Sequence, residues 1–179
     1  MARKGRPEPP MGVLRRLDAG ARAGFPALFT GLLIAVAAVP VGVPGLAAAI
    51  ALPPVFFWTV FRPAAMPAPA VFALGLLLDL VSFAPLGIGV LTLLVAHGVA
   101  MRLRDWVVKQ SFLLVWLVFC LFAIATAALG FLLHALLMLQ VPPRMPAVLQ
   151  AGMAAGIYPL LGWALARLHM AMTRAEEAA

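Results

Sequence analysis

Charged residues are absent from long blocks of this sequence, and this feature restricts the fold more than any other. No ionisable side chain lies between Arg22 and Arg62, and only Asp79 and His97 lie between Arg62 and Arg102. A helix that crosses the hydrocarbon core of a bilayer needs about 20 apolar residues, so each block is long enough for two crossings. The chain is 65% hydrophobic and 11% charged, whereas water-soluble domains carry about 25% charged residues. We therefore expect lipid to surround most of the chain.

The apolar runs also indicate which secondary structure crosses the lipid. Only α-helices and closed β-barrels satisfy every backbone polar group there, and these runs lack the alternation of apolar and polar residues that barrel strands need. The sequence therefore predicts an all-α, polytopic transmembrane bundle. The net charge of +7 does not indicate nucleic-acid binding, because the Lys and Arg residues lie in tails and turns, where they set membrane topology.

No arrangement of side chains in the sequence indicates catalysis, a metal or a cofactor. There is no pair of acids, no Ser or Cys beside a base, and no glycine-rich phosphate loop. Cys120 has no second cysteine for a disulfide, and the three histidines lack metal-ligand spacing. We therefore expect a protein that is not an enzyme and holds no cofactor.

Clusters of Pro and Gly divide the chain into six expected membrane helices. They cover about residues 25–39, 45–61, 70–81, 86–101, 111–139 and 147–168. The expected organisation is a basic cytoplasmic tail, a transmembrane domain and a short cytoplasmic tail, at residues 1–24, 25–170 and 171–179. The fifth helix has no internal Pro, so we expect one long helix with Gly130 as a candidate kink. A hairpin within residues 110–143 is the alternative.

The amino-terminal tail leaves more than one interpretation open. Four of its residues share one side of a helix, namely Met11, Leu14, Leu17 and Ala21. The tail therefore either lies on an anionic leaflet as an amphipathic helix or only sets topology as a mobile segment. A secretory signal is less favoured: Ala35-Val36-Ala37 resembles a cleavage site, but the basic region is long and apolar character continues beyond it.

Basic residues predict the orientation of the helices. With the amino terminus in the cytoplasm, twelve of the thirteen Lys and Arg residues fall on the inner side, and only Arg144 falls outside. Both termini are then cytoplasmic, whereas the hairpin alternative would move the carboxyl terminus outside. Indole rings prefer the membrane interface, and this topology places four of them at or near its cytoplasmic side: Trp58, Trp106, Trp116 and Trp163.

Asp79 is the only acid inside an apolar run. An ionised carboxylate at the centre of a bilayer costs about 2.5–3.5 kcal/mol on insertion scales, so it needs a partner or a function. One hypothesis is that it accepts hydrogen bonds from backbone N–H groups in the turn at residues 82–85 and caps the next helix. The other is contact with a partner protein. His134 is the better candidate for a side-chain partner at similar depth, and a direct pair with His97 is not expected.

Small residues recur at four-residue spacing, which lets helices approach closely in lipid. Gly152 and Gly156 in the sixth expected helix are one such pair. Packing inside the bundle is the simpler explanation of this spacing. For this pair, an intersubunit face is the alternative.

The segment from Phe57 to Gly89 resembles the characteristic segment of the MreD family. Its matching features are an aromatic end to the second apolar run, Arg62-Pro63, Pro67, Gly75-Leu76-Leu77-Leu78-Asp79, Ser82 and Pro85-Leu86-Gly87. The turn departs from the family at Phe83, where glycine or another small residue is more frequent. Length and the basic tail also resemble that family, whereas the chain after residue 111 matches it only in hydropathy.

The resemblance implies a non-catalytic subunit of the bacterial cell-elongation (rod) complex, located in the inner membrane and supporting lateral peptidoglycan synthesis. Implied partners are membrane lipids, an MreC-like protein, the MreB system, and RodA with its transpeptidase partner. Asp79 and the Pro85-Leu86-Gly87 turn would shape one partner contact.

The family's fold is similar to the substrate-binding subunits of energy-coupling-factor vitamin transporters, which supplies an alternative function: capture of a small solute. That function needs a pocket with several convergent polar groups. The expected membrane helices offer few beyond Asp79, His134 and some hydroxyls.

Overall fold

The computed structural model describes residues 13–38, 43–82 and 85–177. Residues 1–12, the turn at Pro40 and the departure at Phe83 lie outside these ranges. In the described part, all regular structure is helical, with six α-helices and one 3-10 turn. Their bounds are α1 Val13–Ala37, α2 Leu46–Phe61, η1 Pro63–Ala65, α3 Ala68–Ser82, α4 Ile88–Val107, α5 Phe112–Met138 and α6 Met145–Glu177.

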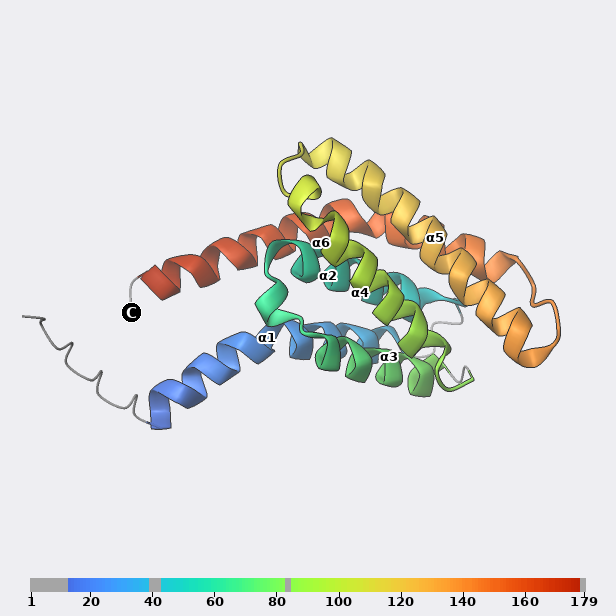
Figure 1. Ribbon diagram of the computed structural model, residues 1–179, viewed down its shortest axis with the longest axis horizontal. Helices are drawn as coiled ribbons and strands as arrows, with labels where there is room; N and C mark the ends of the chain where they lie inside the picture. Colours follow the sequence, from blue (N-terminus) through green and yellow to red (C-terminus); the bar gives the residue numbers. More distant parts are fainter. Residues whose placement is uncertain (1–12, 39–42, 83–84, 178–179) are drawn as a thin grey trace, which may run out of the picture.

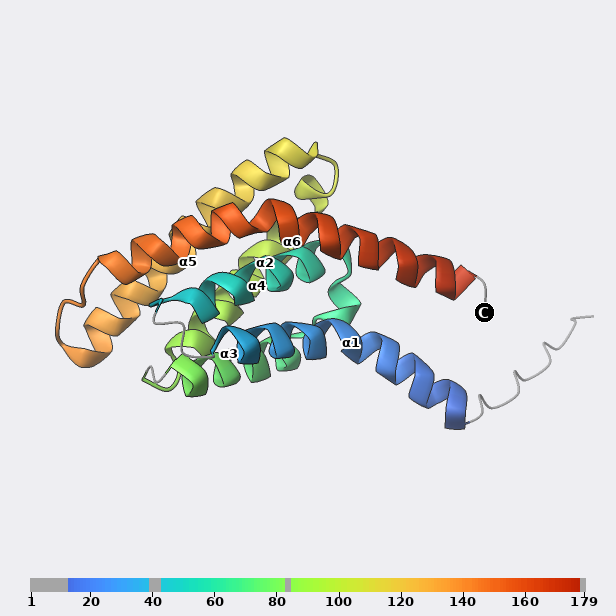
Figure 2. The ribbon, with the colours of Figure 1, turned by 180° about the vertical axis from the view of Figure 1, so that it is seen from behind.

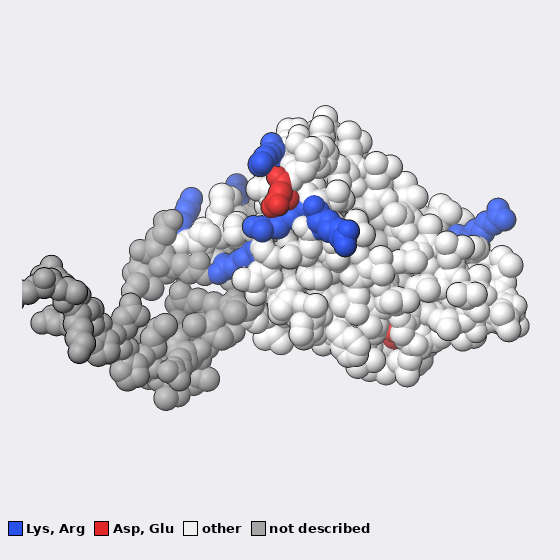
Figure 3. Space-filling model, in the orientation of Figure 1, with Lys and Arg blue, Asp and Glu red and all other residues white. Residues whose placement is uncertain are grey.

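The six helices run alternately back and forth along one bundle (Figures 1 and 2). The carboxyl ends of α1, α3 and α5 lie at one end of the bundle, beside the starts of α2, α4 and α6. We call this the turn end. The other end holds η1, the carboxyl end of α4 and the start of α5. We call it the basic end, because it carries Arg62, Arg102, Arg104 and Lys109, whereas Arg144 lies at the turn end. Figure 3 shows this separation on one face: blue side chains gather toward one end, and blue also marks the far end, where the chain carries Arg144.

Helix α2 forms the centre of the bundle. It packs against α1, α4 and α6, and every residue from 51 to 60 is buried. The helix has no charged residue, so its full burial leaves no ionised group without a partner. It continues through Pro53 and Pro54, each of which lacks the N–H that normally closes a helical turn.

Aromatic rings join α2 to α5 and α6. The ring of Phe56 lies 5.3 Å from that of Phe119, 5.0 Å from that of Phe122 and 6.0 Å from that of Tyr158, measured between centroids. Phe119 and Tyr158 stack at 4.0 Å. Because rings bury a large apolar area and also attract one another through their charge distribution, this cluster stabilises the packing of α2 on α5 and α6.

The expected helix limits agree best where Pro or Gly marks them. Helix α2 matches the expected 45–61 closely, and α5 is one unbroken helix, so the hairpin alternative is wrong. Helices α1 and α6 both extend further than their apolar runs, to Val13 at one end and Glu177 at the other. The extensions are rich in Leu, Arg, Ala and Met, which favour helix, so the loss of apolar character does not end the helix.

Two helices are long and apolar enough to cross a membrane, at Phe112–Met138 and Met145–Arg174. Three more are apolar but shorter, at Gly24–Ala37, Leu46–Phe61 and Ala68–Ser82.

The tryptophans do not all lie where the sequence suggested. Trp58 is fully buried, and its ring lies 6.3 Å from that of His169. Its ring therefore packs inside the bundle, one turn before Arg62 at the basic end, and its depth relative to the interface stays a prediction. Trp106 and Trp163 are exposed, and the guanidinium of Arg167 lies 4.8 Å from the ring centre of Trp163.

Candidate functional site

The carboxylate of Asp79 caps the start of a neighbouring helix. It lies in the last turn of α3 and accepts hydrogen bonds from the backbone N–H groups of Gly87 at 2.8 Å, Gly89 at 2.6 Å and Val90 at 3.3 Å. The first N–H groups of any helix lack partners within that helix, and Gly87, just before α4, has no side chain to supply one. The capping hypothesis for Asp79 is therefore confirmed. The residue is only 1% exposed.

Two glycines make this cap possible. A methyl group added to Gly89 would lie 2.5 Å from Oδ1 of Asp79, and one added to Gly75 would lie 2.5 Å from the Cα of Val90. Both distances are shorter than atoms tolerate, so helices α3 and α4 approach this closely only because these residues lack side chains. Gly87 has a φ of 104°, a conformation that glycine adopts readily and other residues do not. We call Asp79, Gly75, Gly87 and Gly89 the α3–α4 clasp.

Ser82, Pro85 and Leu86, the described neighbours of the clasp in this turn, do not bond the carboxylate of Asp79. Pro85 accepts a hydrogen bond from the N–H of Ile88 at 3.3 Å, whereas Leu86 is 67% exposed and Ser82 is also exposed. The turn therefore presents an apolar side chain at the surface of the turn end.

Arg62 and Pro63 lie at the opposite end of the molecule. The N–H of Arg62 donates to the carbonyl of Trp58 at 2.9 Å, which closes α2, and Pro63 begins η1. Nε of Arg104 donates to the carbonyl of Val60 at 3.0 Å. These residues end α2 and attach it to α4. The motif of the resemblance is thus divided between the two ends of the bundle.

The histidines have separate environments. Nδ1 of His97 lies 2.9 Å from the hydroxyl of Thr59, a single hydrogen bond to the neighbouring helix α2. His134, the better candidate for a side-chain partner of Asp79, borders the same cavity, but the described hydrogen bonds of the carboxylate all come from backbone N–H groups.

Gly152 and Gly156 are exposed on α6, and an added methyl group at either would meet no atom within 4 Å. Packing inside the bundle therefore does not explain this pair. The intersubunit face stays a prediction.

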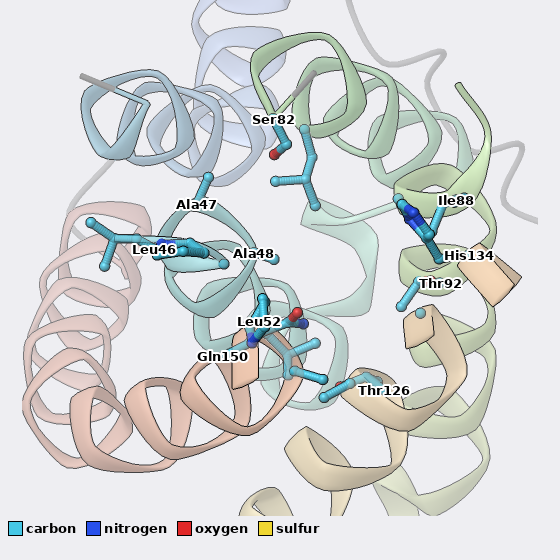
Figure 4. Close-up of a pocket in the computed structure, with 18 of the residues that line it drawn as sticks. Leu46, Ala47, Ala48, Leu52, Ser82, Ile88, Thr92, Thr126, His134 and Gln150 are labelled. Atoms are coloured by element: carbon cyan, nitrogen blue, oxygen red, sulfur yellow. The ribbon is translucent and has the colours of Figure 1, made fainter. Parts of the chain in front are cut away.

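A cavity of about 680 Å³ opens beside the clasp at the turn end, and all six α-helices contribute to its wall. Most of the lining side chains are Ala, Val, Leu, Ile and Pro. Figure 4 shows that the polar lining side chains belong to different helices: Ser82 to α3, Thr92 to α4, His134 to α5 and Gln150 to α6. The polar lining residues are Asp79, Ser82, Thr92, Thr126, His134 and Gln150.

Sequence reasoning missed Thr92, Thr126 and Gln150 as cavity residues. Hydroxyls in an apolar helix commonly bond the carbonyl three or four residues earlier, as Thr126 does with Phe122 and Ala123. The presence of a threonine in the sequence therefore does not show that it lines a cavity. In contrast, the Oγ1 of Thr92 is buried and makes no hydrogen bond. The long-range packing of α4 on α5 places it there, and no local pattern reveals that.

The arrangement defines an all-helical protein in which a carboxylate cap joins two helices beside a mainly apolar cavity. Among the described residues, no group of three His, Cys, Asp or Glu side chains is placed to hold a metal ion. No family model, curated protein or solved structure matches this chain.

Proposed function

We propose that this chain is a multi-pass inner-membrane subunit of the MreD type that performs no catalysis and assembles with other membrane proteins of the cell-elongation complex. The α3–α4 clasp carries the proposal. Three residues of the resemblance, Gly75, Asp79 and Gly87, belong to this clasp, which joins the start of α4 to α3 beside the exposed Leu86.

Six crossings with both termini in the cytoplasm belong to this proposal. The alternating direction of the helices and the gathering of basic residues at one end support it. So do large apolar side chains exposed on the outside of the bundle, among them Leu28, Leu121 and Leu160, because water-soluble proteins rarely expose extensive apolar patches.

The shorter helices fit a membrane for a physical reason. Helix α2 has 16 residues, about 24 Å at 1.5 Å per residue, which is less than the hydrocarbon thickness of about 30 Å. Because its neighbours enclose α2, its length need not match the lipid. Helix α3 has 15 residues and exposes Phe72 and Leu80, and a bilayer thins locally around a short helix at modest cost.

In this proposal the partners include an MreC-like protein, and Leu86 lies in the contact with it. Asp79 acts on that contact through the turn and does not touch the partner. In this proposal the chain associates with RodA, its transpeptidase partner and the MreB system as members of the same assembled complex.

Co-purification tests this contact. We expect Leu86→Ser to reduce the amount of MreC-like protein recovered with the tagged full chain from bacterial membranes. The matched control is Leu160→Ser, which changes an equally exposed apolar residue on α6 (70% against 67%). Equal recovery by both variants at wild-type abundance would reject the turn as the contact.

The cavity favours a second candidate function, a membrane subunit that binds a small solute. It brings together polar groups from four helices, which is what such a function needs. Co-purification with a transporter ATPase would support this candidate over the first.

A further inference from the structure

We propose that the cavity beside the clasp binds a neutral, mainly apolar small molecule whose one hydrogen-bonding group meets Oγ1 of Thr92. The cavity volume of about 680 Å³ lies within the roughly 300–1,000 Å³ of ligand pockets. This inference goes beyond partner docking, because it concerns the inside of the bundle and not the exposed turn.

Thr92 supplies the polar anchor. Its side chain lines the cavity, is only 8% exposed, and its hydroxyl makes no hydrogen bond. A buried hydroxyl without a partner is unfavourable, and most are bonded. The neighbouring Thr126 donates to carbonyls of its own helix, so Thr92 is the hydroxyl that a bound molecule would satisfy.

Gly130 provides the space in front of this hydroxyl. A methyl group added to Gly130 would lie 3.8 Å from Oγ1 of Thr92, in ordinary contact. Any larger side chain there would extend into the space that a ligand needs. Helix α5 therefore leaves room at a position close to the anchor.

The charge of the wall determines the charge of the molecule. Asp79 contributes a carboxylate, and no Lys or Arg is among the described lining residues. An anion would be repelled by that carboxylate at short range. A cation is not required, because three backbone N–H groups already bind the carboxylate. A neutral molecule fits both conditions, and the Ala, Leu and Pro side chains of the wall would contact its apolar body.

Two probes with the same apolar body test the proposal, 4-phenylbutanol and 4-phenylbutyrate. The full chain is placed in nanodiscs of neutral lipid, and saturable binding is measured by ligand-detected NMR. We expect the alcohol to bind and the carboxylate not to bind. Thr92→Val keeps the shape but removes the hydroxyl, and we expect it to weaken alcohol binding about 2- to 10-fold, the value of one neutral hydrogen bond.

Gly130→Leu should abolish alcohol binding by filling the cavity, whereas Gly152→Leu, made on an open surface, should bind as the wild type does. If Gly130→Leu fails to fold, Thr92→Val still decides. Absence of saturable alcohol binding, equal binding of the two probes, or an unchanged affinity in Thr92→Val would overturn the proposal.

Mass spectrometry of extracts from purified wild type and Thr92→Val identifies the natural source. A compound depleted in the variant and found in the organic extract assigns a membrane lipid, and one found in the aqueous extract assigns a solute. Either result supports the proposal. Co-purification of the MreC-like partner with Thr92→Val tests the scaffold function separately. Failure of the ligand proposal therefore does not imply failure of the scaffold proposal, and the reverse also holds.

Discussion

Replacing Asp79 with alanine should lower the free energy of unfolding by about 3–6 kcal/mol. Two of its three hydrogen bonds are short, at 2.6 and 2.8 Å, and the third is longer, at 3.3 Å. A hydrogen bond to a charged group contributes about 1.5–3 kcal/mol, so the two short bonds give this range. The cavity lies beside the carboxylate, and water entering it could satisfy the N–H groups left behind. The lower end, about 3 kcal/mol, is therefore expected.

Asp79→Asn separates the hydrogen bonds from the shape of the side chain. The amide has the same outline, but its single carbonyl oxygen can serve only one side, and its NH₂ group then faces a backbone N–H that needs an acceptor. We expect a loss of about 1.5–3 kcal/mol, the value of one such bond. The order of stability should be wild type, then Asn, then Ala.

Unfolding in mixed micelles with increasing SDS, followed by far-UV circular dichroism, measures these differences. Leu80→Ala is the control, since the next residue along α3 is 58% exposed and should change stability by no more than about 0.5 kcal/mol. If both Asp79 variants also fall within 0.5 kcal/mol of the wild type, the carboxylate does not hold the start of α4 and the reasoning is refuted.

Three further changes test the packing by the same unfolding measurement. Gly75→Ala should cost about 1–3 kcal/mol, because the new methyl group would overpack against the backbone of α4. Its control is Gly98→Ala, where the new methyl group has no atom within 4 Å, so this change should be neutral or stabilising by up to about 1 kcal/mol. Equal effects of the two changes would contradict the close approach of α3 and α4. Phe119→Ala should cost about 3–5 kcal/mol, because the ring is fully buried between three others; a loss under 1 kcal/mol would remove it from the core. Trp116→Phe should cost about 0.5–1.5 kcal/mol by losing the hydrogen bond from Nε1 to the carbonyl of Ala155 at 3.0 Å, and no change would show that this bond does not hold α5 to α6.

The sequence predicted the cap because its parts are close together along the chain. Asp79 and Gly89 are separated by ten positions, and a lone acid before a Pro-containing turn has few other partners. For Gly75 and Gly89, the sequence showed only that they belong to the segment that resembles the family. Their structural role depends on the distance between the backbones of α3 and α4, which the spacing of residues along the sequence does not predict.

The cavity could not be predicted in the same way. Thr92 and Gln150 come from helices far apart in the sequence, and each lies in a run where a single hydroxyl or amide is unremarkable. The carboxyl end of α6 was missed for another reason: its limit was set where apolar character ends, whereas helix formation continues through Ala, Met and Arg. For α1, a helical tail was one of the two alternatives, and the structure has helix from Val13.

Under the proposed six-span topology, the α3–α4 clasp also has a consequence for biogenesis. A ribosome completes α3 before α4, so the acid of Asp79 leaves the translation machinery ahead of the amide groups that will bind it. Under this proposal, α3 carries a carboxylate without its hydrogen-bond donors until α4 is made, and such a charge disfavours release of α3 alone into lipid. In that topology the two helices are suited to enter the bilayer together, as a hairpin whose second helix supplies the hydrogen bonds that the carboxylate of the first accepts.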